Sequence, residues 1–159
     1  MNAHEAEYRI IDEPKRGGLA HLAVNPLWVF LAMMLGGAWL GWPWFVLNSF
    51  AIGSATKARE IGLVVAGLLG AIALTWFGFY LVRAGSIDGD NLAYAATALI
   101  ALKLGITYFV FLPQSRSYEL FQYFEGETRQ GFLIVIAGML LRSRVLDALP
   151  NEFWRFVLL

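Results

Sequence analysis

The chain has 159 residues, of which 58% are hydrophobic and 15% aromatic, and its 12 basic side chains balance 12 acidic ones. Soluble domains carry about a quarter charged residues, so a share of 15% indicates a membrane protein. The net charge is zero and the sequence has no basic cluster, so it predicts no basic surface of the kind that binds nucleic acid. The lack of cysteine excludes disulfides, thiolate metal sites and cysteine nucleophiles.

Residues 1–25 form a polar segment that we expect to be cytoplasmic. Both histidines of the chain, His4 and His21, lie in it. The spacing of His4 and Glu7 is too sparse for a metal site, and no Gly-rich phosphate loop precedes a helix. The sequence therefore predicts no metal, no cofactor and no catalytic residues.

Three long apolar segments follow. Residues 27–52 and 61–82 contain no charged side chain, and residues 92–112 contain only Lys103. A helix needs about 20 apolar residues to cross the roughly 30 Å hydrocarbon core of a bilayer. Each segment is long enough, so we expect three transmembrane helices.

The first segment begins at Pro26, a residue suited to the first turn of a helix. Pro43 interrupts it two-thirds of the way along and predicts a kink. Because Trp42 and Trp44 flank that proline, we place the kink at the headgroup level, within an aromatic belt.

Two short polar stretches connect these segments. Residues 53–60 predict a tight turn, with Glu60 in the first turn of the second span, where a carboxylate complements the helix dipole. Residues 83–91 hold Asp88 and Asp90, as at the start of a calcium loop. The bidentate acid of such a loop is missing, so we interpret this stretch as a solvated turn.

The pattern becomes amphipathic after Pro113. Residues 114–130 mix aromatic and charged side chains, which predicts an interfacial segment or, alternatively, a partner-binding surface. The apolar run 132–141 covers only about 15 Å, so a full fourth span must continue to roughly Leu149. Residues 150–159 indicate an amphipathic tail.

The predicted fold is an all-α polytopic membrane bundle over residues 26–149. It has four transmembrane helices, or three and a short re-entrant or interfacial helix. Four spans place seven Lys and Arg residues on the side of the termini and four on the other side. The positive-inside rule then places both termini in the cytoplasm.

Rows of small residues predict how the helices pack, since small side chains let helices approach closely in lipid. We expect these rows to pack within one chain rather than against a second copy. They are Ala32, Gly36, Gly37 and Gly41; Gly62, Ala66 and Gly70; and Ala93, Thr97, Ala101 and Gly105.

Lys103, Asn48 and Arg142 form the candidate intramembrane polar site. Inserting a central lysine costs about 2.5–3.5 kcal/mol, and the apolar segments contain no acidic partner. Asn48, Thr75, Tyr80 or carbonyls freed at a proline are candidate partners. Alternatively, Lys103 is neutral, extends to the headgroups, or meets a carboxylate on another protein.

The stretch "NPLWVFLAMMLGGAWLGWPWFVLNSFAIGSATKARE" carries Gly36, Gly37, Asn48 and Gly53 ahead of a charged turn. This pattern resembles the first hairpin of small, uncharacterised bacterial integral membrane proteins. The resemblance covers about a quarter of the chain. It implies a bacterial inner-membrane location and carries over no activity and no functional residues.

These observations predict a non-enzymatic accessory or interaction protein of a bacterial inner membrane. An immunity-type protein that protects the membrane from a toxin is one specific form. Its partners would be the lipid bilayer and a membrane protein or further copies of itself. The alternative is an oligomeric small transporter or channel subunit with Lys103 in a polar pathway.

Overall fold

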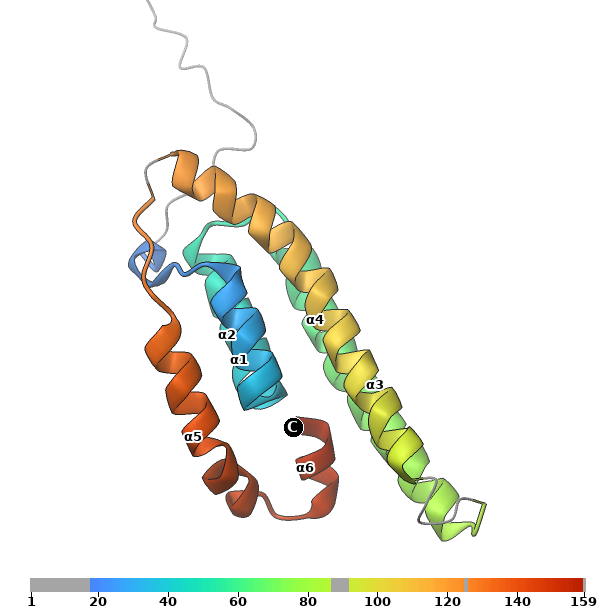
Figure 1. Cartoon of the computed structure of the whole chain (residues 1–159). Helices are drawn as coiled ribbons and strands as arrows, with labels where there is room; N and C mark the ends of the chain where they lie inside the picture. Colours follow the sequence, from blue (N-terminus) through green and yellow to red (C-terminus); the bar gives the residue numbers. More distant parts are fainter. Residues whose placement is uncertain (1–17, 87–91, 125, 159) are drawn as a thin grey trace, which may run out of the picture.

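The computed structural model describes residues 18–86, 92–124 and 126–158, and over these residues the fold is all-helical (Figure 1). This confirms the predicted fold class at the level of secondary structure. Most of the N-terminal polar segment and the Asp88–Asp90 turn lie outside the described residues. The helices are η1 (Ala20–Leu22), α1 (Pro26–Gly36), α2 (Ala38–Ala51), α3 (Lys57–Arg83), α4 (Leu92–Tyr123), α5 (Phe132–Ala148) and α6 (Glu152–Leu158).

The predicted first span is two antiparallel helices, α1 and α2, and this corrects the expectation of one helix over residues 27–52. The chain reverses at Gly37, where φ is 106°, a backbone conformation that favours glycine. The start of α1 consequently lies beside the end of α2, with Val24 hydrogen-bonded to Asn48. Each arm is short, about 17 Å for α1 and about 21 Å for α2 at 1.5 Å per residue.

Glycine also lets the two arms touch. A Cβ built on Gly41 would lie 2.5 Å from the Cβ of Met33, eight residues earlier in the sequence. In a continuous helix these two positions would be about 12 Å apart along the axis. The Gly-rich stretch therefore forms a hairpin instead of packing one long helix against its neighbours.

Helices α3 and α4 form a long antiparallel pair, and they are the two described helices long and apolar enough to cross a membrane. They approach closely at Gly67, where an added Cβ would lie 2.8 Å from Ile106 and 3.1 Å from Trp42. Trp42 and Trp44 are buried, which corrects the prediction of an aromatic belt. The hairpin directs both indole rings into the bundle.

The end of α4 differs from the predicted interfacial segment 114–130. The helix continues through Pro113 to Tyr123, so the first part of that segment is a direct extension of the third apolar run. Its last residues run alongside the start of the hairpin, where the Arg129 N–H donates to the Ala23 carbonyl at 2.8 Å.

Helices α5 and α6 complete the bundle. α5 packs against α1, with Gly131 close to Trp28, and α6 turns back toward the closed end of the hairpin (Figure 1). Val157 of α6 shares one buried apolar cluster with Met33 and Ala38 at that closed end. Two short elements thus enter the bundle from opposite ends and meet inside it.

The predicted internal packing of the small-residue rows is only partly correct. Ala93, Thr97 and Ala101 on α4 are exposed, and a Cβ on Gly105 would meet nothing within 4 Å. Close approaches do occur at Gly41 of the first row, and they occur also at glycines outside the rows that face large side chains, such as Gly67 and Gly131. The spacing of small residues in the sequence identified helix faces that carry small side chains, but it did not show which of these faces pack against another helix.

We expect Gly41→Leu to destabilise the protein, because the new side chain would overlap Met33 and force the hairpin arms apart. Overpacking of this kind costs typically 1–3 kcal/mol. Gly62→Leu on α3 is the matched control, since a Cβ there meets nothing within 4 Å. Thermal unfolding in detergent measures both, and equal midpoints for the two variants would contradict the hairpin.

Candidate functional site

The candidate site includes the C-terminal ends of two helices, α1 and α6, which lie inside the bundle. The last carbonyls of a helix have no intrahelical partner and carry partial negative charge. α1 ends at Gly36, which is buried, and α6 ends next to Val157, which is fully buried. An unpaired buried polar group costs about 1–3 kcal/mol, so both ends need donors from the protein.

Arg142 and Trp39 cap the end of α1. A guanidinium N–H of Arg142 donates to the Leu35 carbonyl at 3.2 Å, and the indole N–H of Trp39 donates to the Gly36 carbonyl at 2.7 Å. A cation near a helix C-terminus is favoured by the dipole. Arg142, in the second half of α5, therefore adds an exposed contact to the closed end of the hairpin, while Trp39 binds the carbonyl of the buried Gly36.

Lys103 caps the end of α6. Its side chain is only 3% exposed, and Nζ donates to the Phe156 carbonyl at 2.5 Å. Phe156 lies in the last turn of α6, so the ammonium group meets the negative end of a helix. The partner of this lysine is a backbone carbonyl of the C-terminal tail, and none of the side chains considered from the sequence.

One hydroxyl links Lys103 to the hairpin. Thr107 donates to the Lys103 carbonyl at 2.7 Å and accepts a hydrogen bond from the Trp42 indole N–H at 3.1 Å. Thr107 is fully buried. α2 and α4 are thus joined at the level where α6 ends, so that Lys103 lies in the centre of a polar connection between three helices.

Asn48 holds the open end of the hairpin. Its side chain accepts from the Val24 N–H at 3.0 Å and donates to the Val24 carbonyl at 3.1 Å and to Gln114 Oε1 at 3.0 Å. The amide of Gln114 continues inward, donating to the Phe45 carbonyl at 3.0 Å and to Ser49 Oγ at 2.9 Å. Both amides are buried.

This amide chain leads to a buried carboxylate, Glu60, which is 1% exposed. Four neutral groups donate to it, all from α2, α4 or the loop before α3. Ser54 and Thr56 bind Oε1 at 2.5 and 2.7 Å, Gln114 binds Oε2 at 3.1 Å, and Ser49 also binds Oε2. Hydrogen bonds to an ionised acceptor are stronger than neutral ones.

Glu60 has no cationic partner among the described residues, where Arg155 and Glu152 form the only ion pair. Its position in the first turn of α3 agrees with the expectation from the sequence. The positive end of the α3 dipole favours its negative charge there. Glu60 therefore acts as a fixed acceptor that ties the end of α2 to α3 and α4.

The structure separates Asn48 from the other two predicted site residues. Asn48 belongs to the network around Glu60, whereas Lys103 caps α6 and Arg142 caps α1. The positive charges of Lys103 and Arg142 are near enough to act on each other. Neither Gln114 nor the burial of Glu60 was predicted from the sequence. A polar side chain directly after Pro113 is the available signal, but the charged residues that follow it favour a surface segment.

Chemically, these groups bind backbone and side-chain partners of their own chain. Lys103 and Arg142 donate to carbonyls, and the Glu60 oxygens accept from hydroxyls and an amide. No family model, curated protein or solved structure matches this chain. The geometry itself is therefore the basis for a functional proposal.

We expect Lys103→Met to release α6, because the Phe156 carbonyl loses its donor while the rest of the bundle keeps its contacts. The substitution also removes the free-energy cost of burying the lysine charge. The free energy of unfolding of the whole protein would therefore not isolate the loss of the cap. Amide hydrogen exchange of residues 152–158 is a direct readout, and a lost hydrogen bond of about 1 kcal/mol corresponds to roughly fivefold faster exchange. Lys57→Met, on the exposed start of α3, is the control. Unchanged exchange in α6 would contradict the capping role.

We expect Gln114→Met to lower the free energy of unfolding by at least about 2 kcal/mol, because it leaves Asn48, the Phe45 carbonyl and Glu60 each one partner short. Gln122→Met, two turns along on the exposed face of α4, should change it little. Chemical denaturation of both variants in the same detergent makes the comparison. Equal losses would show that the network is not a stabilising unit.

Proposed function

We propose that this chain is a multi-pass protein of a bacterial inner membrane that acts as a non-enzymatic accessory protein. α3, α4 and α5 cross the bilayer, while the α1–α2 hairpin and α6 enter it from opposite faces and stop inside. Helices α3 and α4 have the length and hydropathy for a span. The 17 residues of α5 extend about 26 Å, close to the roughly 30 Å of hydrocarbon.

The outer surface supports insertion into lipid. Large apolar side chains are exposed on three helices, with exposed fractions of 64% for Trp76 and 76% for Leu133. Continuous exposed apolar surface marks an interaction or membrane-facing site. Asn48, Glu60, Lys103 and Gln114 lie inside instead, which is the arrangement expected when the solvent is lipid. Arg144 and Asp147, near the end of α5, are exposed.

The single observation that carries the accessory role is that Lys103, Arg142 and Glu60 are each bound within the chain. Charged groups that are engaged in holding helix ends are unavailable as catalytic groups or as relay sites. The parts left for an interaction are the apolar outer face and the polar end of α4. A membrane protein partner would bind there, and an immunity-type role against a membrane toxin is one form of this proposal.

A second candidate, an oligomeric transporter or channel subunit, is favoured by one feature. Two short elements meet next to Lys103 from opposite ends, and transporters build their sites from such interrupted helices near the bilayer midplane. This role requires self-association, since one small bundle offers little room for a polar pathway.

The hairpin also changes the proposed topology. Because it returns to the end at which it enters, the segment before α1 and the α2–α3 loop lie on one side. That side carries Lys57, Arg59, Arg116 and Arg129, and the sequence ahead of residue 18 contributes Arg9, Lys15 and Arg16 to the count of basic residues. The positive-inside rule places it in the cytoplasm. The C-terminal tail then enters from the opposite face, not from the cytoplasm.

Cysteine labelling tests this topology, since the natural chain has no cysteine. We expect Leu22→Cys and Lys57→Cys to react with a membrane-impermeant maleimide from the cytoplasmic side. Ala84→Cys, at the end of α3, should react from the other side. A continuous span over residues 27–52 would instead place residues 22 and 57 on opposite sides.

Affinity purification from native membranes in mild detergent, with mass determination of the complex, tests the function. We expect a stoichiometric foreign membrane protein to accompany the chain. A homo-oligomer alone, with ion flux in liposomes that falls in Lys103→Leu, would overturn the accessory role in favour of transport. A monomer without flux would remove the transporter alternative.

A further inference from the structure

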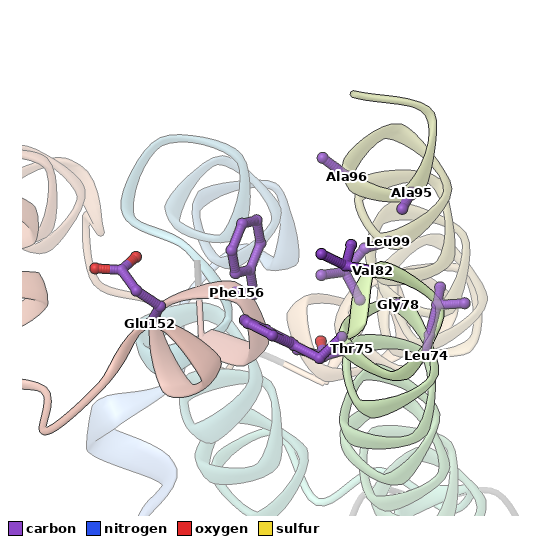
Figure 2. Close-up of a pocket in the computed structure, with 10 residues that line it drawn as sticks. Leu74, Thr75, Gly78, Val82, Ala95, Ala96, Leu99, Glu152 and Phe156 are labelled. Carbon is purple, nitrogen blue, oxygen red and sulfur yellow. The ribbon is translucent and has the colours of Figure 1, made fainter. Parts of the chain in front are cut away.

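A cavity of about 180 Å³ lies between α3, α4 and α6 (Figure 2). Gly78 and Thr75 of α3, Ala96 and Leu99 of α4, and Phe156 of α6 contribute to its wall. Almost all of the wall is apolar. For comparison, an engineered cavity of about 150 Å³ lined by apolar side chains binds benzene, so this one has room for one small apolar group.

One polar atom in this cavity lacks a partner. Thr75 is only 6% exposed, and its Oγ1 is the one buried side-chain polar atom among the described residues without a hydrogen bond. In Figure 2 the Thr75 oxygen lies between α3 and α6. Leaving such a hydroxyl unpaired costs about 1–3 kcal/mol.

Two other threonines in the helices do have hydrogen-bond partners, unlike Thr75. Thr97 and Thr107 on α4 each donate to the carbonyl four residues earlier, at 2.8 and 2.7 Å. Thr75 does not form this common helix bond. Its hydroxyl is therefore an unused hydrogen-bonding group at the wall of the cavity.

The charge at the cavity favours a neutral ligand. Glu152 contributes to the wall, but its carboxylate is paired with Arg155 at 2.9 Å. The Lys103 ammonium is bound to the Phe156 carbonyl, and Lys103 is not among the residues of the cavity wall. Neither charge is free to pair with an ionic ligand.

A second cavity of about 470 Å³ lies beside the first. It shares Phe79 and Glu152 with the first cavity and is lined also by Trp76, Tyr80 and Arg83, at the end of α3. Aromatic and basic side chains at a helix end mark the level of the lipid headgroups. The first cavity therefore lies next to the end of α3 at which a lipid-soluble molecule would arrive.

We infer that the cavity binds a small neutral lipid-soluble molecule, with an apolar chain or ring against α3, α4 and α6 and one hydroxyl or carbonyl oxygen hydrogen-bonded to Thr75. The inference rests on the proposed membrane location, because such a ligand would arrive through lipid. It adds to the accessory role a ligand that contacts α6 directly.

The probe for the test is octan-1-ol carrying a photoreactive diazirine, applied to the protein in lipid nanodiscs, with labelled residues mapped by mass spectrometry. We expect saturable labelling of the cavity wall that unlabelled octan-1-ol competes. Thr75→Val keeps the shape and removes the hydroxyl, and we expect apparent affinity to fall about threefold to tenfold, the value of one hydrogen bond.

Gly78→Leu places a large side chain at the cavity wall, where a Cβ meets nothing within 4 Å, and should abolish saturable labelling by occupying the cavity. Gly62→Leu, on the same helix and outside the cavity, should preserve it. Equal labelling of all four proteins, or equal labelling by the diazirine-bearing octane without a hydroxyl, would overturn the site. A chain that does not enter nanodiscs at all would instead contradict the proposed membrane location.

Discussion

The structure depends on one constraint, that backbone groups at the ends of helices need partners even where no water is at hand. A bundle of complete spans meets it easily, because every helix ends at the surface. Here α1 and α6 end inside, and the chain supplies a cation for each. Arg142 and Lys103 provide the two caps. Lys103 and Arg142, the charged residues that the sequence suggests as functional, thus bind the ends of helices α6 and α1.

The Glu60 network follows the same logic at the open end of the hairpin. Val24 just before α1 and Phe45 within α2 have backbone groups that face neighbouring helices, and Asn48 and Gln114 bind them. The amides in turn donate toward a carboxylate. Three hydroxyls and one amide donate to the buried Glu60 side chain, so both of its oxygens have partners within the chain. The network holds three helices in register at one end of the bundle.

Helix content and the two long helices α3 and α4 followed from the sequence, because long apolar segments with charged flanks allow few other structures. The hairpin did not, since residues 27–52 are apolar throughout and a turn buried among other helices needs no polar residue to mark it. Gly36 and Gly37 were visible, but a Gly-Gly pair within an apolar run is equally compatible with close helix packing. Lys103, Asn48 and Arg142 were predicted as a candidate intramembrane polar site, but the hydrogen-bond partners that the structure gives them were not. Most of these partners are backbone carbonyls, and a carbonyl's position depends on tertiary structure, which residue spacing does not report.

The hairpin at Gly37 also bears on how the protein is made. The cap on its closed end comes from Arg142, 107 residues after the Leu35 carbonyl that it binds, and Gln114 lies 66 residues after Asn48. At a synthesis rate of roughly 5–20 residues per second, the first helices wait on the order of 10 s for these groups. The contacts that close the two ends of the hairpin can therefore form only after α4 and α5 have been synthesised, so the hairpin is local in sequence at its turn but depends on distant residues for its completed hydrogen bonds.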